Sequence, residues 1–213
     1  MRSRSSIWLF IGLVFGLPVL VYLFVNAYES RLQKLPVIGP AVEKEGKMTD
    51  HRIHDFSLIN QDGRQITTSE WDNKIVIADF FFTRCPSVCP QMTRSMKRVQ
   101  KSFNDNAGLQ FASFSVDPYR DSMEVLQKYS RKYELDNRNW NLITGDKKTI
   151  YALARNSFML VAADGDGGAE DFIHSEKLVL LDAEKRIRGY YNGTNEKEVT
   201  QLIRDIKKLK DEK

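Results

Sequence analysis

A nearly unbroken apolar run ends just before the only two cysteines of the chain. Residues 75–82, Ile-Val-Ile-Ala-Asp-Phe-Phe-Phe, are typical of a strand buried on both faces of a sheet, and Cys85 and Cys89 follow it. Apolar residues then recur at helical spacing at Met92, Met96, Val99 and Phe103. Two thiols four residues apart lie about one turn apart on a helix, and a helix N-terminus favours the thiolate form. The sequence therefore predicts a reactive strand-to-helix junction.

The N-terminal segment has the composition of a membrane anchor. Ile7 to Val25 is a run of 19 residues without a charge, and Arg2 and Arg4 precede it. About 20 apolar residues span a bilayer, and basic residues ahead of such a run favour a cytoplasmic N-terminus. Because a signal-peptide core has only roughly 7–15 apolar residues, we expect an uncleaved single-pass anchor, with a cleaved signal as the alternative. Either interpretation places the rest of the chain on the exported side, periplasmic or equivalent.

The remaining chain is long enough for one folded domain. We expect a cytoplasmic N-terminus over 1–6, a transmembrane anchor over 7–25, a tether over 26–47 and a domain over 48–213. The net charge of +4 is spread over interleaved acidic and basic residues, without a compact basic patch that alternates with aromatic residues. The composition therefore argues against a nucleic-acid partner.

The order of the expected elements indicates a three-layer α/β domain that follows an N-terminal transmembrane helix. An Asp62-Gly63 turn is typical of a hairpin, and Asp121 with Glu124 resembles a helix-capping pair. In chain order, we expect a hairpin over 54–68, strands over 75–83 and 109–116, each followed by a helix, a short helix over 146–156, a hairpin over 172–191 and a last helix.

His174 is the candidate for a third functional residue. It stands between the glycine-rich segment 164–168 and an apolar stretch typical of a strand, so it can face the junction that carries the cysteines. Two thiolates and one imidazole suit Cu(I), whereas zinc requires a fourth ligand that the sequence does not obviously offer. An ordinary hydrogen-bonded histidine is the alternative, and spacing alone favours it.

Several segments resemble the Sco/SenC family in their order and separation. The most specific are Phe-Phe-Thr-Arg-Cys-Pro-Ser-Val-Cys-Pro at 81–90 and Phe-Ile-His-Ser at 172–175. Weaker matches are Ser-Val-Asp-Pro at 115–118, Trp140 with Leu-Ile-Thr-Gly at 142–145, and the N-terminal apolar run. The resemblance covers roughly residues 50–210.

The resemblance implies a thioredoxin-like fold, anchored in a membrane with the domain outside. It implies a copper ion bound by Cys85, Cys89 and His174, as Cu(I) with Cu(II) left open, and a role in assembling the binuclear copper site of cytochrome c oxidase. The copper-receiving subunit of that oxidase is then the expected partner, with an upstream copper donor or a thiol reductant acting before it. Asp117, in the matching Ser-Val-Asp-Pro segment, is expected near the site.

Thiol–disulfide exchange is the rival interpretation. Asp79 lies six residues before Cys85, much as a buried acid precedes the first cysteine of thioredoxin. Because a carboxylate in an apolar strand is costly unless it is paired, we expect Asp79 to be either a proton acceptor for a thiol or a hydrogen-bonded structural acid. The Cys-x-x-x-Cys spacing, and the lack of any proline after Pro118, argue against a general thioredoxin.

The preferred hypothesis is a copper chaperone, and the alternative is a membrane-anchored thiol–disulfide oxidoreductase that acts on exported cysteine pairs. In the second case Cys85 and Cys89 are the catalytic residues. The two roles are compatible, because reduced thiols are needed both to bind copper and to reduce a disulfide.

Overall fold

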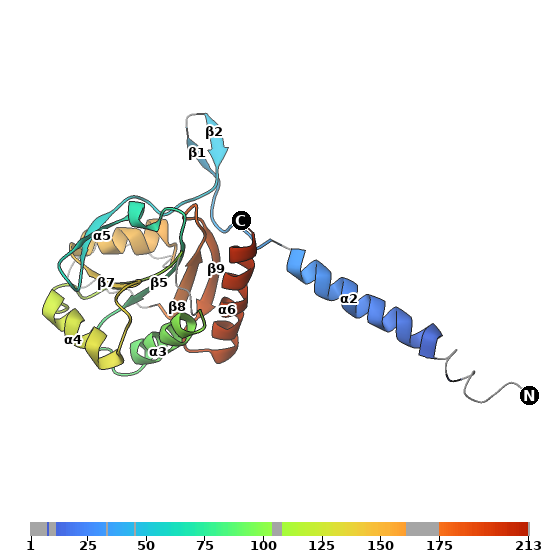
Figure 1. Cartoon of the computed structure of the whole chain (residues 1–213). Helices are drawn as coiled ribbons and strands as arrows, with labels where there is room; N and C mark the ends of the chain where they lie inside the picture. The colour runs from blue at the N-terminus through green and yellow to red at the C-terminus, as the bar shows by residue number, and fades with distance from the viewer. Residues whose placement is uncertain are drawn as a thin grey trace, which may run out of the picture. The chain divides into compact units, whose positions relative to one another are not determined.

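The computed structural model describes residues 8, 12–32, 34–44, 46–103, 108–160 and 175–212. The chain divides into two compact units, with the boundary between Lys34 and Leu35. The N-terminal unit contains a π-helical turn, η1 (Gly12–Gly16), and the helix α2 (Leu17–Leu32) (Figure 1). Among these described residues, no helix combines the length and the apolar character needed to cross a membrane.

The larger unit is built on a seven-stranded mixed sheet with the order β4-β3-β7-β6-β5-β8-β9. Its central strand is β5 (Ile75–Phe81), which pairs in parallel with β6 (Leu109–Ser115) and antiparallel with β8 (Lys177–Leu181). The other strands of this sheet are β3 (Ser57–Asn60), β4 (Gln65–Thr67), β7 (Trp140–Thr144) and β9 (Ile187–Asn192). A separate antiparallel pair is formed by β1 (Val42–Lys44) and β2 (Lys47–Thr49). Because β5, β6 and β7 run parallel, their carboxyl ends meet at one edge of the sheet.

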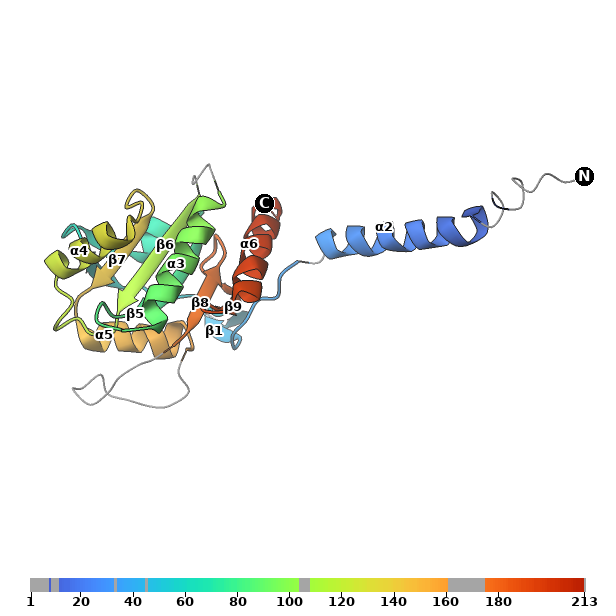
Figure 2. The same cartoon turned by 90° about the horizontal axis from the view of Figure 1, so that it is seen from below.

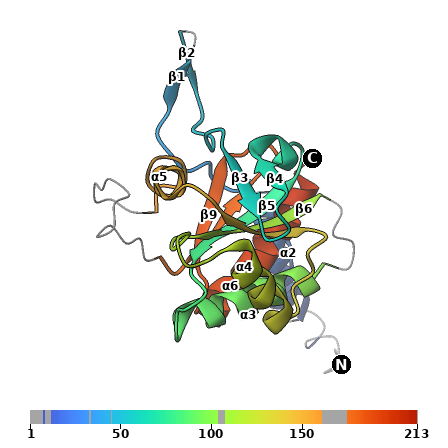
Figure 3. The ribbon, with the colours of Figure 1, turned by 90° about the vertical axis from the view of Figure 1, so that its left-hand side faces the viewer.

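Helices cover both faces of the sheet, so the unit has three layers (Figures 2 and 3). One face carries α3 (Val88–Lys101), α4 (Met123–Tyr133) and α6 (Glu196–Asp211). The other face carries α5 (Lys147–Ala152) with its π-helical continuation η3 (Leu153–Ser157), and the 3-10 turn η2 (Thr68–Trp71). The three-layer α/β architecture and both expected hairpins are confirmed for the residues described here.

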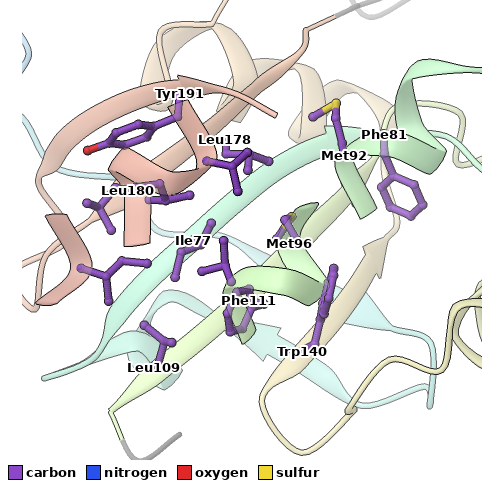
Figure 4. Close-up of a cluster of buried hydrophobic side chains, with 14 of the residues drawn as sticks. Ile77, Phe81, Met92, Met96, Leu109, Phe111, Trp140, Leu178, Leu180 and Tyr191 are labelled. Atoms are coloured by element: carbon purple, nitrogen blue, oxygen red, sulfur yellow. The ribbon is translucent and has the colours of Figure 1, made fainter. Parts of the chain in front are cut away.

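The alternation of side chains along β5 explains why both faces must be covered. Ile75, Ile77 and Phe81 point into the core on the α3 side, whereas Val76 and Phe80 point into the core on the α5 side. Figure 4 shows the first of these cores, in which the helix α3 buries Met92 and Met96 completely. These methionines therefore serve packing, as their helical spacing predicted.

Arg188, in the strand β9, forms hydrogen bonds with the first residues of the larger unit. The guanidinium is buried and donates hydrogen bonds to the carbonyl oxygens of Leu35 (2.6 Å) and Pro36 (3.2 Å). It also pairs with Asp182 at 2.9 Å, and both of these side chains are almost inaccessible to solvent. The segment that enters the unit is thus attached through a buried ion pair.

The start of α4 differs from the expected Asp121–Glu124 capping pair. Ser122 is the N-cap: its hydroxyl accepts from the N–H of Val125 at 3.5 Å and donates to Glu124 at 2.6 Å. Asp121 is buried instead and faces another loop. The strand β7 was not expected either, although the resemblance had included Trp140. Residues 172–174 of the last expected hairpin lie outside the described residues.

Candidate functional site

The two cysteines lie where β5 leads into α3, at the edge of the sheet that the parallel strands share. Cys85 is in the loop after β5, and Cys89 is in the first turn of α3. Both are free thiols and both are buried. The N–H of Cys89 points at Cys85 and donates a hydrogen bond to its Sγ at 3.3 Å. The predicted strand-to-helix junction is therefore present, with both thiols in it.

The two thiols differ in acidity. Burial opposes ionisation of Cys85, but the N–H groups of Cys89, Ser87 and Val88 and the Cys89 thiol together hold its pKa below the usual value. Burial, with smaller contributions from Cys85 and Asp79, raises the pKa of Cys89 to about 12, although a hydrogen bond with the backbone of Phe82 acts in the opposite direction. Cys85 is therefore the thiol that ionises first, as expected for a sulfur at a helix N-terminus.

Asp79 lies on the same side of β5 as the cysteines. Its carboxyl is 1% exposed, and in the described part of the chain Oδ1 has no hydrogen-bond partner. Burial raises the pKa of Asp79 to about 7, although a hydrogen bond from Ser113 acts in the opposite direction. Ser113 is itself held by the indole N–H of Trp140, at 3.0 Å. A carboxyl that takes up a proton near neutral pH thus lies within electrostatic reach of Cys89.

A hydroxyl pair supports the turn that carries Cys89. Thr93 donates a hydrogen bond from Oγ1 to the carbonyl oxygen of Cys89 at 2.9 Å and shares another with the hydroxyl of Tyr129 at 2.7 Å. The ring of Tyr129 packs on Phe81, with 5.2 Å between their centroids. These contacts join the first turn of α3 to α4 and to the end of β5. Sequence reasoning had overlooked Thr93, although its position four residues after Cys89 was a usable signal.

Asp121 connects the cysteine loop to the loop after β6. Its carboxylate accepts hydrogen bonds from the N–H (3.1 Å) and the hydroxyl (2.5 Å) of Thr83, two residues before Cys85. It also accepts from the hydroxyl of Ser115 at 2.6 Å. Because the carboxylate is buried, water has little access to compete for these hydrogen bonds. The three bonds therefore hold the two loops together.

Of the two remaining predicted site residues, Asp117 is described by the structure and His174 is not. Asp117 lies in the loop after β6, beside the cysteine loop, and its carboxylate pairs with Arg120 at 3.2 Å. His174 lies outside the described residues. Within the residues that the structure does describe, no cluster of three or more His, Cys, Asp or Glu side chains could hold a metal ion. The arrangement of described residues is thus a soft dithiol pair, which suits Cu(I) or thiol exchange.

Comparison with models of known protein families assigns the chain to one of them. The SCO1/SenC family model matches residues 44–211. The chain belongs to the SCO1/SenC family. The SCO1 protein homologue of Bacillus subtilis (strain 168) is 30% identical to it over 160 residues, which are 74% of this chain and 82% of that protein.

Solved Sco structures share the fold of this family member. BsSco, a member of the Sco family of cytochrome c oxidase assembly proteins with a disulfide switch, is 27% identical and has a TM-score of 0.66. That match covers 85% of this chain and 100% of BsSco. Copper-bound ScoI of Bradyrhizobium japonicum is 22% identical, with a TM-score of 0.59 over 73% of this chain and 98% of ScoI. The larger unit of this Sco protein therefore has the thioredoxin-like fold that the resemblance implied.

Proposed function

We propose that this Sco/SenC protein is a copper chaperone that helps to assemble the binuclear copper site of cytochrome c oxidase. Cys85, Cys89 and His174 are the proposed copper ligands, and the copper-receiving subunit of the oxidase is the proposed partner. The observation that carries the proposal is the pair of free, buried thiols at the start of α3. The oxidase assembly role of BsSco and the copper bound to ScoI support it at the level of the family.

The environment of the thiols fits copper as cargo. The N–H groups that lower the pKa of Cys85 make it the thiol that gives up its proton more readily to an arriving metal. Cys89, whose pKa lies at about 12, must lose its proton to become a ligand, so copper and the proton compete for its sulfur. Delivery of Cu(I) then needs no electron: thiolates of the acceptor replace Cys85 and Cys89, which take protons back.

Copper affinity of single-residue variants tests the three ligands. The reduced full-length protein, in detergent, is titrated with Cu(I) against a chromophoric chelator. We expect Cys85→Ser, Cys89→Ser and His174→Ala each to weaken retention by about 10- to 100-fold, with X-ray absorption showing two sulfur ligands and one nitrogen in the wild type. His54→Ala, at an exposed histidine before β3, is the matched control. Unchanged affinity in the His174→Ala variant would remove that residue from the site.

Thiol–disulfide exchange is the second candidate function, and the unequal acidity of the thiols favours it. The Cys85 thiolate attacks one sulfur of a partner disulfide and releases the other as a thiolate. Cys89 then attacks Cys85, so the partner leaves as a dithiol while this protein becomes a Cys85–Cys89 disulfide. Asp79 is the proposed acceptor for the Cys89 proton, and an upstream dithiol reductant must restore the pair. A wild type that fails to retain copper yet cycles this disulfide would establish the second function.

We also propose that residues 7–25 anchor the protein and that residues 26–47 connect this anchor to an exported domain over 48–213, with the part of the connection from Leu35 onward bonded to the domain. The support is the uncharged run of 19 residues behind two arginines. Added protease should digest the domain in osmotically opened cells with an intact inner membrane, and alkaline carbonate should not release the full-length protein. Release by carbonate, or protection of the domain until the membrane is dissolved, would contradict the anchor or its orientation.

A further inference from the structure

Large apolar side chains are exposed in only two places among the described residues of the larger unit. Val37, Val42 and Met48 belong to the segment that precedes the main sheet. Tyr119 and Met123 belong to the loop after β6 and to the start of α4. Tyr119 is 81% exposed, which is high for an aromatic ring in a folded domain.

The loop after β6, which contains Tyr119, leaves the sheet next to the loop that contains Cys85. Phe81 of β5 pairs with Ser115 of β6, so the loops that follow these strands leave the same edge of the sheet. The buried Asp121 holds the loop that contains Tyr119 to Thr83, two residues before Cys85. Tyr119 is thus carried by a loop whose base is fixed, which reduces the entropy lost when a partner binds.

The cysteine loop contributes further apolar surface. Phe82 and Val88, on either side of Cys85, are only partly buried against the core. Tyr119 stands on the neighbouring loop, which Asp121 holds to Thr83, whereas the sulfur of Met123 lies against Gly63 in the β3–β4 turn. Single exposed apolar residues are ordinary, but a group of them beside a reactive site marks an interaction surface.

Positive charges that form no ion pair within the described part of the chain lie on the cysteine loop and on α3. Arg84 is exposed directly before Cys85, and Arg94 is exposed in α3; no ion pair involves either of them among the residues that are described. The helix α3 contains no acidic residue, and of its four basic residues Lys97 is paired with Glu134 at 2.9 Å. Of the nearby acids, Asp117 is paired with Arg120, and Glu124 accepts a hydrogen bond from Ser122.

We infer that Tyr119 and the arginines at 84 and 94 form a docking surface for an acidic partner protein that exchanges copper with the thiols. Tyrosine and arginine are among the residue types enriched in protein interfaces, with aromatic anchors at their centres. The positive charge steers an acidic partner, and the apolar group then holds it with its own ligands facing Cys85. This inference rests on the proposed function and names the chemistry of the receiving partner.

The test is the rate of Cu(I) transfer from the loaded full-length protein, in detergent, to the metal-free copper-binding domain of the oxidase subunit. Stopped-flow measurements compare the wild type with Tyr119→Ala and with the double variant Arg84→Glu/Arg94→Glu. We expect transfer to slow by about 10-fold in each. Transfer from the wild type should also slow as salt increases, and the double variant should lose most of that dependence.

Control variants separate docking from copper binding. The double variant Arg204→Glu/Lys207→Glu makes the same charge change on α6, and Met48→Ala removes another exposed apolar side chain; both should transfer copper like the wild type. Tyr119→Phe should restore the rate, because the ring is kept. Loss of copper to a small chelator should be equally fast in the wild type, the Tyr119 variants and the control variants. For the double arginine variant, transfer is compared with its own rate of loss to the chelator, because Arg84 directly precedes Cys85.

Two results would overturn the inference, and they are distinguishable. Equal, salt-independent transfer by the wild type, Tyr119→Ala and the double variant would remove the docking surface and leave the chaperone function standing. Failure of the wild type itself to transfer copper to the oxidase domain, while a chelator still receives it, would overturn the proposed function and the docking surface together.

Discussion

Cys85 and Cys89 are chemically unequal although only one helical turn separates them. The N–H groups at the start of α3 lower the pKa of Cys85, whereas burial raises that of Cys89 to about 12. Asp79, buried with one carboxyl oxygen unpartnered among the described residues, adds to the second effect. At the scale of single residues, the site thus pairs a more acidic thiol with one that holds its proton more tightly.

Replacement of Asp79 should change how stability depends on pH. Burial raises its pKa from the ordinary 3.8 to about 7, so the folded protein binds this proton more tightly than the unfolded chain does. The resulting stability is fully present below pH 3.8 and is lost as the pH rises through 7. Asp79→Asn should therefore match the wild type near pH 4 and exceed it at pH 8, by about 2–4 kcal/mol in the free energy of unfolding.

Denaturant unfolding of the metal-free protein, followed by tryptophan fluorescence at each pH, measures this difference. The same change at Asp62, in an exposed turn, controls for the removal of one negative charge. A difference between Asp79→Asn and the wild type that stays constant from pH 4 to 8 would show that Asp79 does not titrate in this range.

At the scale of elements, the site depends on how β5 and β6 end. Their parallel pairing brings two loops to one edge of the sheet, and the buried carboxylate of Asp121 then joins them through Thr83 and Ser115. The hydrogen bonds from Thr93 to Cys89 and Tyr129 do the same for α3 and α4. The thiols are therefore positioned by contacts between elements as well as by the helix that carries Cys89.

Asp121→Asn should loosen the loop before Cys85, although the side chain at position 121 keeps nearly the same size. The amide nitrogen cannot accept the hydrogen bond that the Thr83 hydroxyl now donates, and the bonds from the Thr83 N–H and Ser115 no longer end on a charged group, at a cost of about 1–3 kcal/mol. With the alignment of N–H groups around Cys85 relaxed, its pKa should rise. Alkylation by iodoacetamide at pH 7 should then slow by a few fold, and the rate measured against pH should shift to higher pH.

Asp117→Asn is the control in the same loop, because the carboxylate of Asp117 pairs with the exposed Arg120 instead of with Thr83. It should leave the alkylation profile in place. If Asp121→Asn lowers stability but leaves the alkylation profile unchanged, then Asp121 stabilises the fold and does not position Cys85.

At the scale of the whole molecule, the larger unit is closed by a buried ion pair. Arg188 joins Asp182 of the β8–β9 hairpin to the carbonyl oxygens of Leu35 and Pro36. Removing one partner of a buried pair leaves a charge without its counterion. Arg186 also contacts Asp182, at 2.9 Å, and compensates in part.

Arg188→Met should therefore lower the free energy of unfolding by about 2–3 kcal/mol and expose the chain around Leu35 to proteases. Arg138→Met is the matched control, since Arg138 forms an exposed pair with Asp136 and its loss should cost less than about 1 kcal/mol. Denaturant midpoints and limited proteolysis of the two variants measure the effect. Equal stability of both would mean that the buried pair contributes no more than a surface pair.

Local sequence patterns were sufficient for the junction and for much of the sheet. An apolar run next to a helical period predicted β5 and α3, and the Asp-Gly turn predicted the β3–β4 hairpin. These signals are local, because strand and helix periodicity are read from neighbouring residues. The motif at 81–90 and its companions indicated the family from residue identity and spacing, and the family model confirmed it.

The tertiary structure decided which other residues serve the thiols. Asp121 lies 38 residues from Thr83, and Tyr129 lies 36 residues from Thr93, so no local pattern could pair them. The sequence pattern therefore predicted Asp121 as part of a helix cap, whereas the structure has Ser122 as the cap. The strand β7 was not predicted, because its strand pattern is only five residues long. The chain by itself determined the type of chemistry, two thiols at a strand-to-helix junction, since that depends on residue identity and spacing. Only the tertiary structure determined the pKa of each thiol and the hydrogen bonds that hold its loop or helix in place. Burial and these hydrogen bonds arise when distant segments pack together.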